Sequence, residues 1–219
     1  LYTPMGLANL LVYACTGQGH GTRHFIRDYL RFFDTKEQCV EAFRTAFRAG
    51  VACSDGSVWG TFNNHLTVTE EKLEERFGAI FSADVQEKWM SLLGLHNSRA
   101  TAAAPIQPTY TAVIEMAAVL GINGVQSGIT RMQLANNCLL LGVCSPPTVD
   151  EMALVAFTLD AGAKKGLEKL GLDVATKPKF VLGFRLVHNY LAKHLSAADR
   201  DILSFGPPFV EHLLCKVQR

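Results

Sequence analysis

The sequence lacks a long apolar run and has little charge of either sign. The longest uncharged apolar stretch near its start, LANLLVYAC, covers only residues 7–15, whereas a membrane-spanning helix needs about 20 apolar residues. Charged residues make up 19% of the 219 positions, with 21 basic and 20 acidic side chains. No global electrostatic field therefore attracts nucleic acid or a lipid surface, so a nucleic-acid partner must contact a local patch. We predict no membrane contact.

The cysteines form no C-x-x-C pair of the kind found in many zinc sites and redox centres. Six cysteines spread over a chain of this length do not indicate a disulfide framework either. Most of them occupy apolar positions of predicted helices, which favours buried free thiols in a reducing compartment. We therefore expect no metal and no cofactor, and a location in the cytoplasm or in a virion.

Enzyme motifs are absent or incomplete. Gly17, Gly19 and Gly21 precede a predicted helix, as in a phosphate-binding loop, but the spacing is not G-x-G-x-x-G and no G-K-[ST] follows. His20 and His24 have the spacing of a helical metal pair without the glutamate of H-E-x-x-H. No G-x-S-x-G elbow occurs. We predict a non-enzymatic protein; the alternative is a small-molecule-binding enzyme that uses Gly17–His24 as an anion site.

Helix signals repeat along the whole chain. Thr3-Pro4 is a helix start, and Thr35–Gln38 and Thr148–Glu151 have the capping-box pattern. Apolar residues at helical spacing follow these starts. The predicted helices lie near residues 4–16, 22–33, 35–50, 69–80, 82–94, 110–120, 129–141, 148–159, 180–195 and 209–217, and Ser196 begins a further short helix. We predict a compact all-α protein of about ten helices, with at most one β-hairpin at residues 51–62, where Asp55-Gly56 suits the turn.

The segment LHNSRATAAAPIQP, residues 95–108, has the composition of a linker or long loop. It predicts an N-terminal helical lobe at residues 1–94 and a C-terminal helical lobe at residues 109–219. On either side of this segment the helical pattern continues without an internal repeat.

Basic residues recur at helical spacing in the N-terminal lobe. Arginines at positions 23, 27 and 31 share one helix face, and those at 44 and 48 repeat the spacing on the next helix. Guanidinium rows on neighbouring helices can hold a phosphate backbone, although acidic neighbours also suit a solvated, charge-balanced face. The candidate nucleic-acid-binding residues here are Arg23, Arg27, Arg31, Lys36, Arg44 and Arg48.

A second basic region follows Asp160. Its candidate nucleic-acid-binding residues are Lys164, Lys165, Lys179 and Arg185. If both basic regions lined one cleft between the lobes, a strand of RNA would fit between them.

Residues 106–149 contain only two charged side chains, Glu115 and Arg131, and the first 22 residues contain none. Helices without a charged face are either buried on several sides or lie at a subunit interface. The interface alternative predicts a homo-oligomer.

Together these features predict a helical assembly protein that binds single-stranded nucleic acid, RNA more than DNA, and copies of itself. In architecture alone the predicted chain resembles nucleocapsid and filament coat proteins of RNA viruses, which is an analogy of fold and carries no motif. The further alternative is a helical adaptor that recognises other proteins, which would present an exposed apolar groove.

Overall fold

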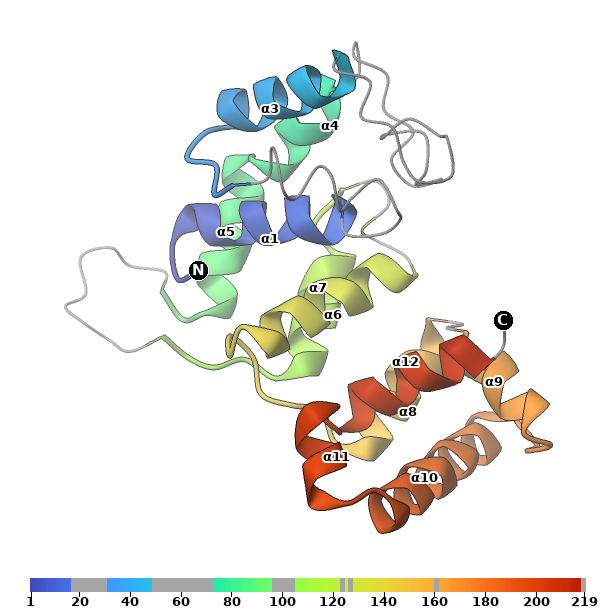
Figure 1. Cartoon of the computed structure of the whole chain (residues 1–219). Helices are drawn as coiled ribbons and strands as arrows, with labels where there is room; N and C mark the ends of the chain where they lie inside the picture. The colour runs from blue at the N-terminus through green and yellow to red at the C-terminus, as the bar shows by residue number, and fades with distance from the viewer. Residues whose placement is uncertain are drawn as a thin grey trace. The chain divides into compact units, whose positions relative to one another are not determined.

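A computed structural model describes residues 1–16, 31–48, 73–95, 105–122, 125, 128–159 and 162–217 (Figure 1). These residues form α-helices and no β-strand, apart from an isolated parallel bridge between Thr109 and Ser145. The predicted all-α fold is confirmed. The hairpin predicted at residues 51–62 and most of the helix predicted at residues 22–33 lie outside the described residues. None of the described helices is both long and apolar enough to cross a bilayer.

The helices belong to two compact units, residues 1–108 with 112–143 and residues 109–111 with 144–219. The first unit holds α1 (Pro4–Thr16), α3 (Lys36–Arg48), α4 (Leu73–Ile80), α5 (Ala83–Leu92), most of α6 (Tyr110–Ala118) and α7 (Ile129–Leu140). The second holds α8 (Val149–Thr158), α9 (Ala163–Lys169), α10 (Lys177–His194), α11 (Ala197–Ile202) and α12 (Pro207–Val217). The sequence-based division differs, since it assigned residues 112–143 to the C-terminal lobe. They pack with the N-terminal unit because α1 lies against α7.

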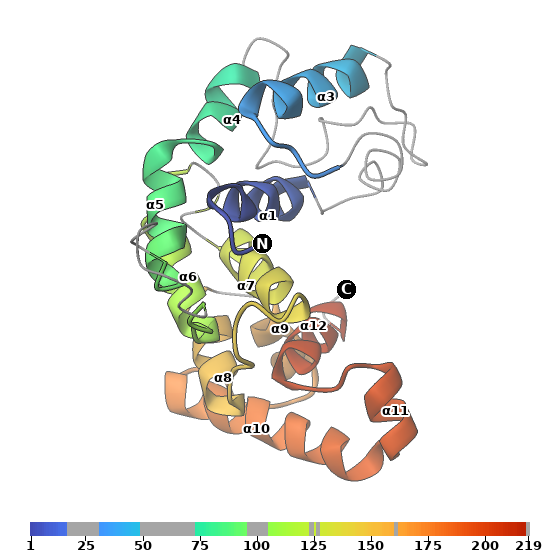
Figure 2. The same cartoon turned by 90° about the vertical axis from the view of Figure 1, so that its left-hand side faces the viewer.

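Helix α1 has no charged residue because neighbouring helices surround it. It contacts α4, α5 and α7, and Leu7, Ala8, Leu11 and Val12 are completely buried. Figures 1 and 2 both show α1 beside α5. A helix enclosed in this way has no solvent-facing side on which charged residues would be favourable. The charge-free start of the sequence therefore reflects burial inside the N-terminal unit.

The charge-poor helix α7 is also largely internal. Met132, Leu134, Ala135 and Cys138 are buried, in agreement with the core alternative of the sequence prediction. Its C-terminal end is different, because Leu140 exposes 77% of its surface. The core interpretation thus holds for the body of α7 and not for its last turn.

One polar side chain, Asn9 of α1, holds the segment that leads into α3. Its Nδ2 donates to the backbone oxygens of Met5 (3.0 Å) and Phe33 (2.9 Å), and its Oδ1 accepts from the Phe33 backbone N–H at 2.7 Å. The amide thereby satisfies both backbone groups of Phe33, whose side chain is fully buried. This contact ties two segments 24 residues apart in the sequence.

In the C-terminal unit, α10 packs on α8 and α12 packs on α9. Both views show α10 running beside α8 and leading into α11 (Figures 1 and 2). Thr148 and Glu151 form the predicted capping box at the start of α8, and Ser196 and Asp199 form another at α11. The aromatic rings of Phe180 and Phe184 on α10 are completely buried.

Helix α9 is absent from the sequence prediction. It has only seven residues, and Gly166 interrupts its helix propensity. The structure explains the glycine: a Cβ at position 166 would lie 2.2 Å from the backbone oxygen of Leu214 on α12. The close approach of two helix backbones requires glycine here, and no local signal in the sequence reveals it.

Helix α12 buries an acidic side chain, Glu211, which exposes only 2% of its surface. The Cys215 thiol donates a hydrogen bond to Glu211 Oε1 at 2.8 Å. Burial raises the pKa of Glu211 because removal from water penalises the charged carboxylate, and this outweighs the effect of the thiol. The folded chain therefore binds a proton at Glu211 over a pH interval in which the unfolded chain has released it.

We expect Glu211→Gln to reduce the pH dependence of stability. Above the ordinary carboxyl pKa of about 4.3 and up to the raised folded pKa, the folded state holds the extra proton, so the free energy of unfolding falls as pH rises. Glutamine cannot ionise, and the variant should gain stability relative to the natural chain at pH 8 more than at pH 5. Calorimetric melting of both proteins at these two pH values measures the difference. Parallel pH profiles would contradict the expectation.

Candidate binding surfaces

Acidic side chains compensate two of the predicted basic residues of the N-terminal unit, Lys36 and Arg44. On α3, Lys36 Nζ lies 3.2 Å from Glu74 Oε2 of α4, and Arg44 lies 2.7 Å from Glu41 and 3.8 Å from Glu74. Arg31 and Arg48 are exposed. Each ion pair lowers the local positive charge that a phosphate would meet. Arg27 and the whole Gly17–His24 loop, which includes Arg23, lie outside the described residues.

Glu74 of α4 is exposed, and it faces two cations of α3, Lys36 and Arg44. The only sequence signal for this pairing is the opposite charge of two amphipathic helices. Their register is decided by the buried contact of Phe43 with Phe77, whose ring centroids are 4.2 Å apart.

Two of the four predicted cations of the C-terminal unit are also paired. Arg185 on α10 donates to both carboxylate oxygens of Asp150 on α8, at 2.6 and 2.8 Å from Nη2, and this raises the pKa of Arg185. Lys179 donates to Asp173, which lowers the pKa of that carboxyl. Lys164 and Lys165 on α9 make no ion pair with the described residues. The proposal that both basic regions line one cleft stays a prediction.

Two observations on the described residues concern metal binding and thiol reactivity. No group of three or more histidine, cysteine or acidic side chains among them is arranged to hold a metal ion. Cys39, Cys138 and Cys144 are buried free thiols, in line with the sequence prediction. Burial raises the pKa of Cys144 to about 11 and raises that of Cys39 further, so both remain protonated near neutral pH. Protonated, inaccessible thiols are poor nucleophiles.

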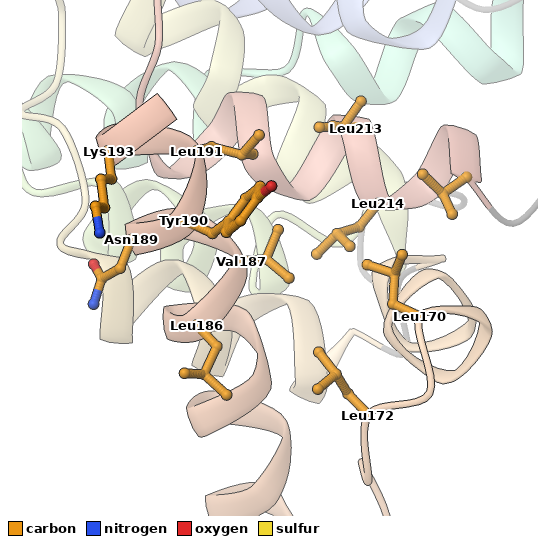
Figure 3. Close-up of a pocket in the computed structure, with 11 residues that line it drawn as sticks. Leu170, Leu172, Leu186, Val187, Asn189, Tyr190, Leu191, Lys193, Leu213 and Leu214 are labelled. Carbon is orange, nitrogen blue, oxygen red and sulfur yellow. The ribbon is translucent and has the colours of Figure 1, made fainter. Parts of the chain in front are cut away.

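An apolar groove of about 760 Å³ lies in the C-terminal unit between α10, α12 and the turn after α9 (Figure 3). Its more deeply buried part comes from Val187 and Leu191 of α10 and Leu214 of α12. Its rim includes Leu170, Leu186 and Tyr190, which expose 52%, 52% and 64% of their surfaces. Large apolar side chains are thus left in contact with water along one side of α10.

One end of this groove is polar. Asn189 and Lys193 lie together at the end away from Leu170 and Leu172, which belong to the turn after α9 (Figure 3). No acidic residue lines the groove. Its surface therefore combines an apolar body with a single cationic end.

The sequence interpretation missed this groove, although a signal for it exists. Leu182, Leu186 and Tyr190 repeat every four residues beside the buried Phe180 and Phe184, so α10 carries apolar side chains on two faces. A helix with one ordinary core face needs only one such stripe. The sequence does not show which of the two apolar faces of α10 is buried against other helices.

Comparison with known proteins adds no assignment, since no family model, no curated protein and no solved structure matches this chain.

Proposed function

We propose that this chain is a non-enzymatic protein-interaction module whose C-terminal unit binds a helix of a partner protein in the groove between α10 and α12. The observation that carries the proposal is the apolar groove itself, with half-exposed leucines on its rim. Exposed apolar surface of this kind is unfavourable in water unless a partner covers it. An amphipathic helix laid in a groove is a common way to cover it.

The shape of the groove favours a helix over a small molecule. Small-molecule sites usually cover 70–90% or more of the ligand surface. Here Leu170, Leu186 and Tyr190 remain at least half exposed, so an occupant would be covered on one side only. A helix has one apolar side to bury and one polar side to leave in water, which matches a groove open along its length.

The test uses a fluorescein-labelled synthetic helical peptide of 20 residues, with leucines at i, i+4, i+7 and i+11 and polar residues elsewhere. We expect saturable binding to the purified chain with a Kd on the order of 10 µM. The double substitution Leu186→Ser and Tyr190→Ser should weaken binding at least tenfold, about 1.4 kcal/mol, because it removes apolar area from the rim. Fluorescence polarisation measures both values.

The matched control is Leu182→Ser. Leu182 lies one turn before Leu186 on the same helix and is 54% exposed, but it does not line the groove. Its substitution should leave the peptide affinity unchanged within about twofold. Equal losses for the control and the rim variant, or no saturable binding up to 1 mM peptide, would refute a binding groove.

A second candidate, binding of single-stranded nucleic acid, is supported by the charge of α10. This helix has Lys177, Lys179, Arg185 and Lys193 and no acidic residue. Next to them the exposed rings of Tyr190 and His194 lie 4.3 Å apart, and exposed rings can stack on bases. The paired Asp150 and Asp173 argue against it, since they neutralise two of the four cations.

If α10 contacts phosphate, removing these carboxylates should strengthen the contact. We expect the double variant Asp150→Asn, Asp173→Asn to bind a 20-nucleotide single-stranded RNA more tightly. The plot of log affinity against log salt concentration should also become steeper, by up to about one unit of slope for each freed cation. Electrophoretic mobility or polarisation at 50 and 200 mM salt measures the change. An unchanged affinity and slope would remove Lys179 and Arg185 from the candidate interface.

A further inference from the structure

The two ends of the groove differ in chemistry, and this difference specifies the partner further. Apolar side chains surround the end near Leu170 and Leu172, whereas Asn189 and Lys193 lie at the other end (Figure 3). An exposed ammonium beside an apolar surface attracts an opposite charge and disfavours an equal one. The polar end is therefore the part of the groove most able to discriminate among partner helices.

Lys193 has no counter-charge within the described part of the C-terminal unit. Two other cations of α10 have theirs, since Lys179 pairs with Asp173 and Arg185 pairs with Asp150, whereas Lys177 at the start of the helix lies outside the groove. No ion pair joins Lys193 to a described carboxylate, and the side chain is exposed. Its charge is thus available to a bound molecule.

A second copy of this chain is a poor occupant. If two α10 helices met antiparallel with Leu186 at the centre, Lys179 of one copy would face Lys193 of the other, because both lie seven residues from the centre. Helix α10 has no acidic residue, and the carboxylate beside Lys179, that of Asp173, is already paired with Lys179, so the second copy offers Lys193 no free counter-charge at this position. A two-fold symmetric interface contains this unfavourable pairing twice.

From these observations we propose that the occupant is a partner-protein helix bearing a carboxylate side chain that pairs with Lys193, about two turns from the apolar side chain seated on Leu186. Lys193 follows Leu186 by seven residues, which is about 10.5 Å along the helix axis at 1.5 Å per residue. This inference rests on the proposed function, because it assigns the chemistry of the same groove. It identifies the partner as an acidic amphipathic helix.

The experiment compares three versions of the leucine-bearing peptide that differ only two turns from the central leucine, with Glu, Gln or Lys at that position. We expect the Glu peptide to bind about threefold more tightly than the Gln peptide at 150 mM salt, as for an exposed ion pair. Lys193→Glu should weaken binding of the Glu peptide about tenfold and strengthen that of the Lys peptide. The matched control Lys177→Glu makes the same charge change on α10 outside the groove and should alter neither affinity by more than about twofold.

The outcomes separate the two proposals. If all three peptides bind and lose affinity in the Leu186→Ser, Tyr190→Ser double variant, but Lys193→Glu and Lys177→Glu act alike, the groove stands and the acidic partner is refuted. If no peptide binds, the proposed function itself is refuted.

A 20-nucleotide single-stranded RNA provides the remaining comparison. If this RNA binds instead of the peptides, and its affinity falls with Lys193→Glu but not with Leu186→Ser, the face of α10 is a nucleic-acid surface and the acidic-helix proposal is overturned.

Discussion

Gly166→Ala should destabilise the C-terminal unit by about 2–3 kcal/mol, because a methyl group at this position meets the backbone of another helix. The added Cβ would lie 2.2 Å from the Leu214 backbone oxygen and 2.8 Å from its carbonyl carbon. A side chain could rotate away from such a contact, but a helix backbone must shift as a whole. We expect calorimetry to show a melting temperature lower by roughly 10–20 °C for a unit of this size. Hydrogen exchange in α9 and α12 should also accelerate.

Gly183→Ala is the matched control within the same unit. Its Cβ would lie 3.6–3.7 Å from side-chain carbons of Leu167 and Leu172, which is ordinary van der Waals contact. Since alanine is also the better helix former, this variant should be more stable by about 0.5–1 kcal/mol. Similar effects of the two substitutions would mean that α9 and α12 do not approach as closely as described.

Asn9→Ala should cost the N-terminal unit about 2–4 kcal/mol, since it leaves two backbone groups of Phe33 without their partner. The Asn9 amide accepts from the Phe33 N–H at 2.7 Å and donates to the Phe33 oxygen at 2.9 Å. A buried donor or acceptor without a partner costs more than the net value of the bond that satisfied it. Urea unfolding followed by tryptophan fluorescence measures the loss, because Trp89 is completely buried in this unit.

Gln38→Ala tests whether burial is the reason for this expected loss. Gln38 Oε1 also accepts from a backbone N–H, that of Asp34 at 3.0 Å, but this bond is exposed to water. Water can replace an exposed acceptor, so the cost should stay below about 1 kcal/mol. If the two variants lost equal stability, burial would not be the reason for the cost of removing the Asn9 amide.

Local features of the sequence were sufficient to predict most of the described helices. The capping box at Thr148 and Glu151 and the helical spacing of Phe77 and Ile80 depend on residues within one or two turns of each other, and both are present in the structure. Helix α9 was missed because Gly166 serves a contact with a helix more than 40 residues away. Its local effect on helix propensity is unfavourable, so the local pattern pointed away from a helix.

The predicted nucleic-acid-binding residues also depend on long-range contacts that local sequence patterns do not reveal. The spacing of Lys36 and Arg44 indicated a basic face on α3, and the structure places both on that helix. It also brings Glu74 of α4 to both of them, which the spacing within α3 cannot reveal. For the groove the sequence missed binding residues instead of proposing them. Leu186 and Tyr190 can be named as candidate binding residues only because the fold leaves them exposed.

By itself the sequence determined the all-α class, the apolar, charge-free character of α1 and the absence of a recognisable catalytic motif, because these depend on composition and on short-range periodicity. Only the tertiary structure decided which cations meet carboxylates, which glycine permits two helices to touch, and which apolar stripe of α10 faces water. Each of these depends on the position of a residue far away in the chain. Burial and ion pairing are properties of such long-range neighbours, and a helical repeat carries no information about them.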